Sequence, residues 1–132
     1  MNSYQGTIQS IDTSGSLSLV KVDVKGVIFS AIIIDTPESL PKLKVKNNVH
    51  VVFKESEVVL AKAPINISLQ NRVSGKVSAV DSGKLLTKVT VESPIGSIVA
   101  LITTSAVSQL DIKPDSAIMA LIKTNEVMLS YD

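Results

Sequence analysis

Asn2-Ser3-Tyr4-Gln5-Gly6 near the start of the chain is matched by Asn71-Arg72-Val73-Ser74-Gly75 in its middle. A second pair lies further along each half: Lys54-Glu55-Ser56-Glu57-Val58 and Lys123-Thr124-Asn125-Glu126-Val127. Gly75 follows Gly6 by 69 residues, and Lys123 follows Lys54 by the same 69 residues. A shared offset at both landmarks indicates tandem duplication of one small module, and such modules build sites between their copies.

The repeat divides the chain of 132 residues into a first module, 1–63, a linker, 64–67, and a second module, 68–132. Each half is close to the lower size limit for a self-sufficient core, so we expect the halves to pack on each other or on partner chains. Hydrophobic residues make up 45% of the chain but aromatic residues only 3%. The core must therefore consist of Val, Ile and Leu, which favours strands.

Composition also excludes several classes of function. A net charge of +1 and the scarcity of aromatic residues argue against nucleic-acid binding, which needs a basic surface and stacking platforms. No apolar run approaches the roughly 18–20 residues of a membrane span, and no basic-then-apolar leader follows Met1. The absence of cysteine excludes disulfides and thiolate chemistry. We expect a cytoplasmic protein that binds neither nucleic acid nor a membrane.

Alternation of apolar and polar residues predicts five strands in each half. In the first half they are Gln5–Ile11, Leu17–Val24, Val27–Ile34, Asn48–Phe53 and Val58–Lys62, the last two closing that module. In the second half they are Ser74–Val80, Leu85–Val91, Ser97–Thr103, Ala117–Ile122 and Val127–Tyr131. Ser82-Gly83 and Pro94-Ile95-Gly96 are the expected turns of the second half.

One short helix is expected between the third and fourth strands of each half. Thr36–Leu40 and Thr104–Leu110 both begin with a hydroxyl that can cap a helix, and Pro37 suits the first helical position. Five strands and one helix in this order are typical of a small OB-like barrel. The predicted fold is all-β: two tandem OB-like five-stranded barrels, each with one short helix.

The chain offers little for catalysis. His50 is the only histidine, and it occupies an alternating strand position whose counterpart is Met119. Glu57 and Glu126 repeat, but each follows a lysine closely and is better suited to fixing a turn than to acid–base chemistry. Without cysteine or a cluster of His and Asp, neither a zinc site nor a two-metal centre is credible. We do not expect an enzyme, a protein-bound metal or an organic cofactor.

Hydrogen-bond donors do recur at the ends of strands. In the second half they are Ser68, Asn71, Thr103, Lys123, Thr124 and Asn125, and in the first half Asn2, Lys54 and Ser56. Hydroxyls, amides and one ammonium can form a cage for a compact oxyanion, because charge-assisted bonds to each oxygen supply the affinity. The same residue types are common where strands end, so a role as ordinary turn residues is the alternative.

Three motifs resemble the Mop family, the molybdenum-pterin-binding or molbindin-like domain also described as TOBE. Ile67–Val77 (ISLQNRVSGKV) is similar to its opening signature, Ser-Ala-Arg-Asn followed by Gly-Lys-Val. Ala100–Thr103 (ALIT) is similar to its Ala-Val-Ile-Thr strand. Leu121–Leu129 (LIKTNEVML) is similar to its Val-Ile-Lys-Ala-Ser-Glu-Val-Met-Leu ending. The match covers the second half and, more faintly, the first, so the chain resembles a di-Mop protein.

The resemblance implies intracellular binding of molybdate, or of tungstate as its near isostere, for storage or homeostasis. It also implies a homotrimer of six modules, with oxyanion pockets where modules meet. The implied ligand residues are Ser68, Gln70, Asn71, Thr103, Lys123, Thr124 and Asn125, and in the first half Lys54 and Ser56.

The sequence departs from the family pattern at two of these positions. Gln70 replaces the usual arginine, which removes a bidentate cation, and Asn125 replaces a serine. The first half also has no Ser-x-x-Asn motif.

Two other classes of function stay open. Mop-like units also occur as accessory modules of molybdate-responsive regulators and transporters, fused to DNA-binding or ATPase domains, although we expect no such domain here. The other alternative is a degenerate barrel with only a structural or oligomerising role, which the weak first-half motif and the missing arginine favour. Metal analysis of protein from molybdate-fed cells would discriminate between these functions.

Overall fold

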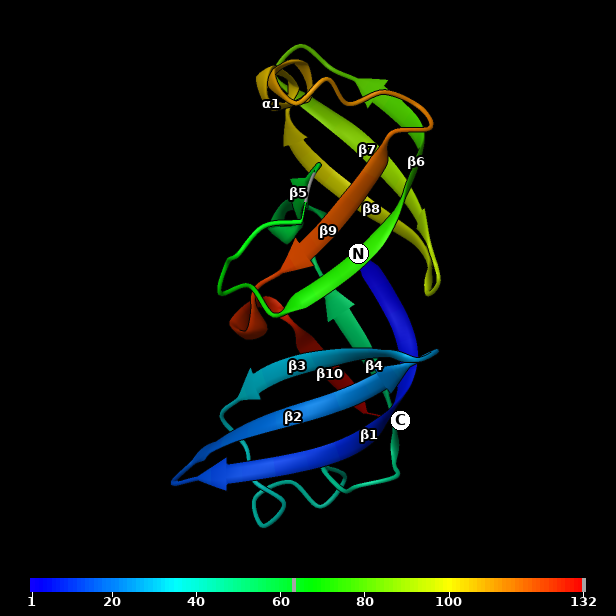
Figure 1. The fold of residues 1–132 in the computed structure, drawn as a ribbon. Helices are drawn as coiled ribbons and strands as arrows, with labels where there is room; N and C mark the ends of the chain where they lie inside the picture. The colour runs from blue at the N-terminus through cyan, green and yellow to red at the C-terminus, as the bar shows by residue number, and fades with distance from the viewer. Residues whose placement is uncertain (63, 132) are drawn as a thin grey trace.

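The computed structural model describes residues 1–62 and 64–131, and it consists of two antiparallel five-stranded sheets (Figure 1). The first-half strands are β1 (Asn2–Ser14), β2 (Leu17–Val24), β3 (Val27–Ile33), β4 (Asn48–Phe53) and β5 (Val59–Ala61). The second-half strands are β6 (Asn71–Ser82), β7 (Leu86–Ser93), β8 (Gly96–Thr103), β9 (Ala117–Ile122) and β10 (Met128–Tyr131). All ten predicted strands are present, and the two five-stranded units confirm the all-β, OB-like class. No helix in the described residues is long and apolar enough to cross a membrane.

The fifth strands are exchanged between the two halves. The sheet orders are β10-β4-β1-β2-β3 and β5-β9-β6-β7-β8. Thus β5 pairs with β9 of the second half, with Leu60 opposite Ala120, and β10 pairs with β4 of the first, with Leu129 opposite Val51. The expectation that Val58–Lys62 closes the first module was wrong. Because β5 and β10 are repeats of one another, sequence pattern alone cannot tell which sheet each strand joins.

The predicted module boundaries therefore do not coincide with the sheets. A short 3₁₀ turn precedes each exchanged strand: η1 (Glu55–Glu57) before β5 and η2 (Thr124–Glu126) before β10. Each turn packs against an edge strand from the other half of the chain. The first-half turn η1 packs against β8, and the second-half turn η2 packs against β3. The ends of the predicted modules at residues 63 and 132 lie outside the described residues.

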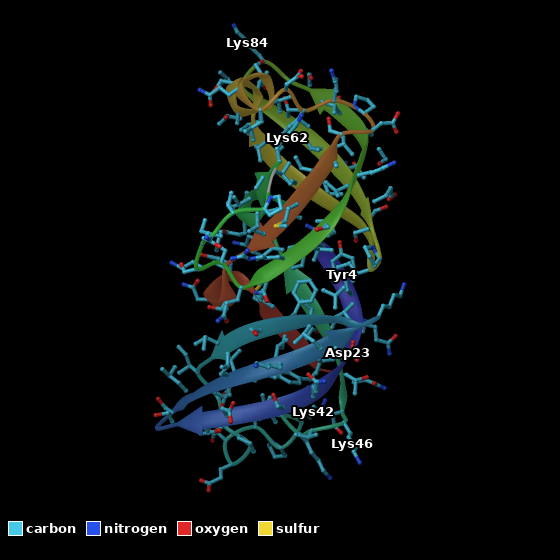
Figure 2. All side chains as sticks on the ribbon, in the orientation of Figure 1. Tyr4, Asp23, Lys42, Lys46, Lys62 and Lys84 are labelled. Carbon is cyan, nitrogen blue, oxygen red and sulfur yellow. The ribbon has the colours of Figure 1, made fainter. Side chains whose placement is uncertain are left out.

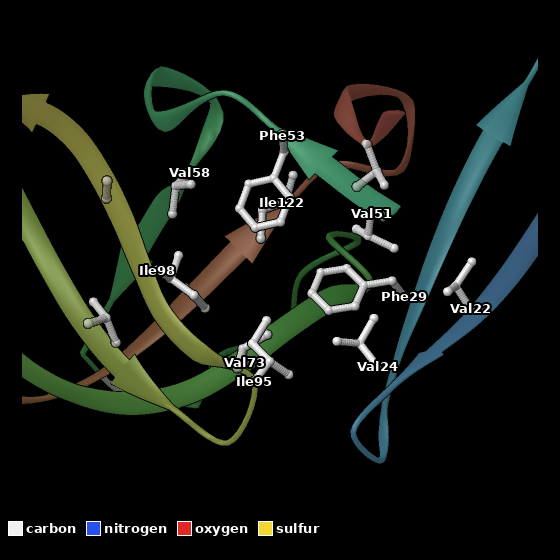
Figure 3. Packing of buried hydrophobic residues seen from close by; sticks show 14 of the residues in the cluster. Val22, Val24, Phe29, Val51, Phe53, Val58, Val73, Ile95, Ile98 and Ile122 are labelled. Atoms are coloured by element: carbon white, nitrogen blue, oxygen red, sulfur yellow. The ribbon is translucent and has the colours of Figure 1, made fainter. Parts of the chain in front are cut away.

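A single hydrophobic core runs through both sheets (Figure 3). The rings of Phe29 and Phe53 stack at its centre with centroids 6.1 Å apart, and Tyr4 stacks on Phe53 at 5.7 Å. Val73 and Ile98 from the second sheet join the same cluster. The shared core explains how two halves that are each too small can both be stable, because each supplies the apolar surface that the other lacks.

The repeated glycines are required by close strand packing. A Cβ on Gly6 would lie 2.7 Å from a methyl group of Val22, and a Cβ on Gly75 would collide with the carbonyl oxygen of Glu92. β1 and β6 also share a register shift two residues further on, between Ile8 and Ser10 and between Val77 and Ala79. Local irregularities of the backbone are thus duplicated together with the strands.

The first half lacks the expected helix. Thr36–Leu40 forms a single turn, in which the N–H of Leu40 donates to the carbonyl oxygen of Thr36 at 2.9 Å. Pro41 follows at once, and a residue before proline is disfavoured in the helical region, so the turn cannot propagate. The second half does form its helix, α1 (Thr104–Gln109), because no proline interrupts it.

Candidate functional site

Asn71, at the start of β6, binds the backbone of the opposite sheet. Its Oδ1 accepts from the N–H of Ser30 at 2.7 Å, and its Nδ2 donates to the carbonyl oxygen of Ser30 at 2.9 Å. Asn71 is 1% exposed, and Ser30 lies on β3, an edge strand. The side-chain amide therefore replaces the missing neighbouring strand at this residue. This differs from the expectation of a free donor, since the amide oxygen and one N–H are already paired within the chain.

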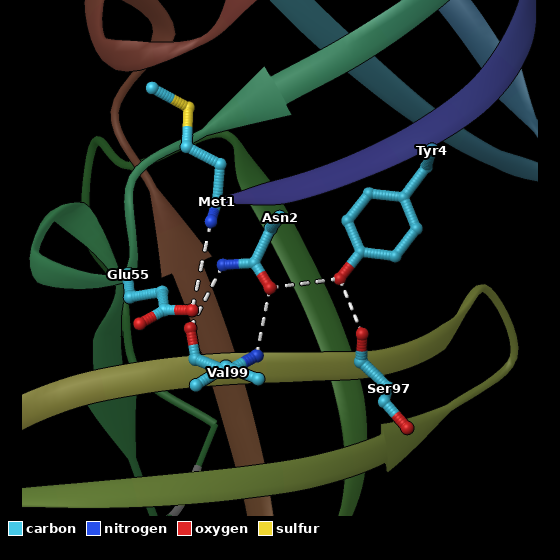
Figure 4. A network of polar contacts seen from close by, with 6 residues as sticks. All are labelled: Met1, Asn2, Tyr4, Glu55, Ser97 and Val99. Atoms are coloured by element: carbon cyan, nitrogen blue, oxygen red, sulfur yellow. Dashed lines mark hydrogen bonds and ion pairs between the residues drawn. The ribbon is translucent and has the colours of Figure 1, made fainter.

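Asn2 makes the equivalent contact from the first sheet to the second, where it binds the backbone of the edge strand β8 (Figure 4). Its Oδ1 accepts from the N–H of Val99 and its Nδ2 donates to the carbonyl oxygen of Val99, both at 2.9 Å. The hydroxyl of Tyr4 donates to Asn2 Oδ1 at 3.2 Å and also bonds the carbonyl oxygen of Ser97. Burial, with a further contribution from Glu92, raises the pKa of Tyr4 to about 12, so this hydroxyl keeps its proton. We call the two contacts, Asn2 with Val99 and Asn71 with Ser30, the asparagine clamps.

We call the predicted second-half residues other than Thr103 the Lys123 cluster; they come from two segments, 68–71 and 123–125. Its members are Ser68, Gln70, Asn71, Lys123, Thr124 and Asn125. The register that pairs Asn71 with Ile122 brings Gln70 and Lys123 side by side, where the chain leaves the paired strands. Ser68, Gln70, Lys123 and Asn125 are exposed and Thr124 is half-buried. Within residues 1–62 and 64–131, the side chains of Ser68, Gln70, Lys123, Thr124 and Asn125 make no recorded hydrogen bond and can donate to a ligand.

The turn that follows Lys123 fixes the backbone conformation of this residue. Its backbone is extended (φ −68°, ψ 144°), and its carbonyl oxygen accepts from the N–H of Glu126 at 3.0 Å. Lys54 repeats this geometry (φ −72°, ψ 148°), accepting from the N–H of Glu57 at 3.0 Å. Among the described residues neither ammonium has an acidic partner within ion-pair distance. Two exposed cations are therefore held at equivalent points of the two halves.

Lys54 and Ser56 form a smaller group beside β8, the Lys54 cluster. Thr103 does not join the Lys123 cluster. It ends β8, which is separated from β9 by β6 and β7, and its Oγ1 caps α1 by accepting from the N–H of Ala106 at 3.2 Å. Within one chain Thr103 therefore belongs to the edge of the second sheet, along the strand on which η1 packs.

Arg72 is a residue that sequence reasoning missed. Its guanidinium donates to three carbonyl oxygens of the segment before β6: Nε to Leu69 at 2.8 Å, Nη1 to Ile65 at 2.9 Å, and Nη2 to Ile67. These bonds hold the segment that carries Ser68. The sequence did offer a signal for this role, because Arg72 lies two residues after Gln70, the position at which the family has an arginine.

The remaining titratable groups do not form a metal or catalytic centre. The described residues contain no group of three or more His, Asp or Glu side chains that could hold a metal ion. His50 is a half-buried residue of β4, opposite Gln5 and Ser130. Figure 2 shows Tyr4 near the junction of the two sheets, whereas Lys42 and Lys46 lie towards one end of the molecule and Lys84 at the other. The labelled lysines are thus spread along the length of the molecule.

Comparison with known proteins connects this fold to molybdenum. Residues 67–129 match the TOBE domain. The molybdenum transport protein ModE of Herbaspirillum seropedicae is 36% identical over 75 residues, which are 56% of this chain but only 28% of that protein. A crystal structure of the cytoplasmic molybdate-binding protein ModG, with molybdate bound, superimposes with a TM-score of 0.93 at 25% identity. That match covers 99% of this chain and 96% of the ModG chain.

The asparagine clamps predict a stability defect. Asn71→Ala leaves the buried N–H and carbonyl groups of Ser30 unpaired, and each such group costs about 1–3 kcal/mol. We expect the free energy of unfolding to fall by about 2–4 kcal/mol in chemical denaturation, and Asn71→Asp to be similarly destabilised because a carboxylate cannot donate to the Ser30 carbonyl. Gln70→Ala, one residue away but exposed, is the control and should change it by less than about 0.5 kcal/mol. Equal stability of Asn71→Ala and wild type would show that the clamp contributes nothing.

Proposed function

We propose, from the TOBE domain that residues 67–129 of this chain form, that the protein binds molybdate or tungstate for storage and homeostasis in the cytoplasm. The observation that carries the proposal is the match to molybdate-bound ModG over nearly the whole of both chains. The exposed lysine turns and their neutral donors supply the chemistry, because a tetrahedral dianion needs several hydrogen bonds and little net positive charge.

The Lys123 cluster is the principal oxyanion site of the proposal. Lys123 supplies the formal positive charge, Ser68, Thr124 and Gln70 supply neutral donors, and Asn125 is the middle residue of the turn that follows Lys123. The Lys54 cluster is its counterpart in the first half, with fewer donors. Thr103 contributes only where copies of the module meet, since it lies apart from Lys123 within one chain.

Association into a trimer of six modules would complete these sites. On a single chain the lysines are open to water, where a charge pair contributes little, and covering them by a neighbouring chain strengthens the attraction. Exposed apolar residues recur at equivalent positions of the two halves: Leu17 and Leu86 are 47% and 50% exposed, and Val59 and Met128 are 47% and 42% exposed. Four such residues at repeated positions favour burial against other copies of the chain.

A second candidate function is an accessory module of a molybdate-responsive regulator or transporter. The similarity to ModE favours it, although the match spans 28% of that protein. Both functions use the same oxyanion site, and they differ in what the bound anion controls. A purely structural barrel is a third possibility, and it differs from both because it would bind no anion.

Selectivity among anions tests the proposed function. Molybdate and tungstate are fully deprotonated at neutral pH, whereas phosphate carries a proton for which a cage of donors offers no acceptor. Competitive calorimetry should therefore find binding of molybdate and tungstate, much weaker binding of phosphate, and weak binding of the smaller sulfate. Equal affinities for phosphate and molybdate, or no binding of either, would contradict the proposal.

The proposed assembly has its own measurement. Light scattering coupled to size-exclusion chromatography should give three times the 14.0 kDa chain mass at micromolar concentration. Leu86→Glu, which places a charge in the exposed apolar surface, should shift the protein towards smaller species. A monodisperse wild-type monomer would exclude the trimer.

Removing one lysine should weaken binding without unfolding the protein. A hydrogen bond to a charged group contributes roughly 1.5–3 kcal/mol, so Lys123→Ala should raise the dissociation constant for molybdate about ten- to a hundredfold. The ligand-free melting temperature should hardly change, because the ammonium is exposed. Conversely, Gln70→Arg should tighten binding by adding a second cation beside Lys123.

Two further lysine variants serve as matched controls. Lys54→Ala should have a smaller effect, because its cluster has fewer donors, and Lys84→Ala, at the far end of the second half, should have none. Unchanged affinity in Lys123→Ala would refute the site assignment even if molybdate binds elsewhere.

A further inference from the structure

The segment before β6 is held in place by one side chain. Arg72 donates to the carbonyl oxygens of Ile65, Ile67 and Leu69, three alternate residues of that segment. Ser68 lies between Ile67 and Leu69, and Gln70 directly follows Leu69. Two of the five members of the Lys123 cluster other than Asn71 therefore depend on this tether for their positions.

The side chain at position 72 has to be arginine to make these contacts. A guanidinium carries N–H donors on three separate nitrogens in a fixed planar fork, and here each nitrogen bonds a different carbonyl. A lysine ammonium has a single nitrogen and cannot reproduce that span. Ile65 and Ile67 are 41% and 42% exposed, so hydrophobic packing holds this segment less firmly than the fully buried strands of the core.

Among the described residues no carboxylate lies within ion-pair distance of the Arg72 guanidinium, and its three recorded partners are neutral carbonyls. Arg72 sits on β6 opposite Leu121, two residues before Lys123 on the neighbouring strand. The arginine thus orders the segment through neutral carbonyl partners and starts from a strand position close to the one that leads to Lys123.

We propose that Arg72 is a positioning residue for the oxyanion site, which holds Ser68 and Gln70 beside Lys123 and so compensates for the glutamine at position 70. This inference rests on the proposed function. The tether has no counterpart in the first half, because Ser3 stands at the position equivalent to Arg72 and its short side chain cannot span three carbonyl groups. Loss of the tether should therefore affect the Lys123 sites and leave the Lys54 sites unchanged.

Two variants separate the tether from the charge. Arg72→Gln removes the fork and the charge, and Arg72→Lys keeps the charge but loses the fork. The control is Lys76→Gln, which removes the same charge from an exposed position on the same strand. Each protein is first examined without ligand by hydrogen exchange. Both Arg72 variants should show faster exchange in the segment 65–70 than wild type or Lys76→Gln, with unchanged protection in β7.

Molybdate calorimetry on the same proteins gives the functional readout. Both Arg72 variants should bind molybdate at the Lys123 sites roughly tenfold more weakly, about the contribution of one hydrogen bond to a charged group, while Lys76→Gln behaves as wild type. Wild-type affinity in Arg72→Gln would overturn the inference and leave the proposed function standing. Full affinity in Arg72→Lys would also overturn it, since charge alone would then suffice. A wild-type protein that binds no molybdate would overturn the proposed function and this inference together.

Discussion

The whole structure depends on how each half closes the open edge of the other half's sheet. Edge strands leave unpaired N–H and carbonyl groups, which are costly when buried and invite wrong pairing when exposed. Here one asparagine amide, with a donor and an acceptor side by side, satisfies both groups of a single edge residue. Asn2 does the same for Val99. Ser30 and Val99 are themselves 69 residues apart, so the donor, the acceptor and their targets were duplicated together.

The clamps and the exchanged strands support the same junction. Once β5 and β10 cross to the opposite sheets, η1 and η2 must lie against β8 and β3, and the clamps fix those two edge strands at that position. Phe29, Phe53 and Tyr4 fill the space between. The lysine clusters lie where the chain crosses, so the positions of Lys54 and Lys123 follow from the junction. A change that loosens the junction would displace both clusters.

Much of this could be predicted from sequence, and the failures have definite physical causes. Alternating residues located the ten strands, because period-two burial is a local property of one strand. The exchange was missed because β5 and β10 carry equivalent patterns, and which partner each chooses depends on contacts distant in sequence. The helix expected at Thr36–Leu40 does not form because Pro41 restrains the residue before it, and this restraint outweighs the capping signal of Thr36. Asn71 was identified as a ligand from its motif, whereas its burial and its bonds to Ser30 appear only in three dimensions.

The repeat therefore combines two kinds of constraint that the sequence does not separate. Asn2 and Asn71, Gly6 and Gly75, and the turns that begin at Lys54 and Lys123 recur because the junction needs them in both halves. The positions that would surround an anion have diverged: Ile34 stands where the second half has Thr103, and Ser3 where it has Arg72. Repetition of a motif is thus an argument for a shared fold, and only the residues that differ between the halves can tell a binding site from its structural copy. By that criterion, Thr103 and Arg72 are the positions at which the proposed second-half site would differ from its first-half counterpart.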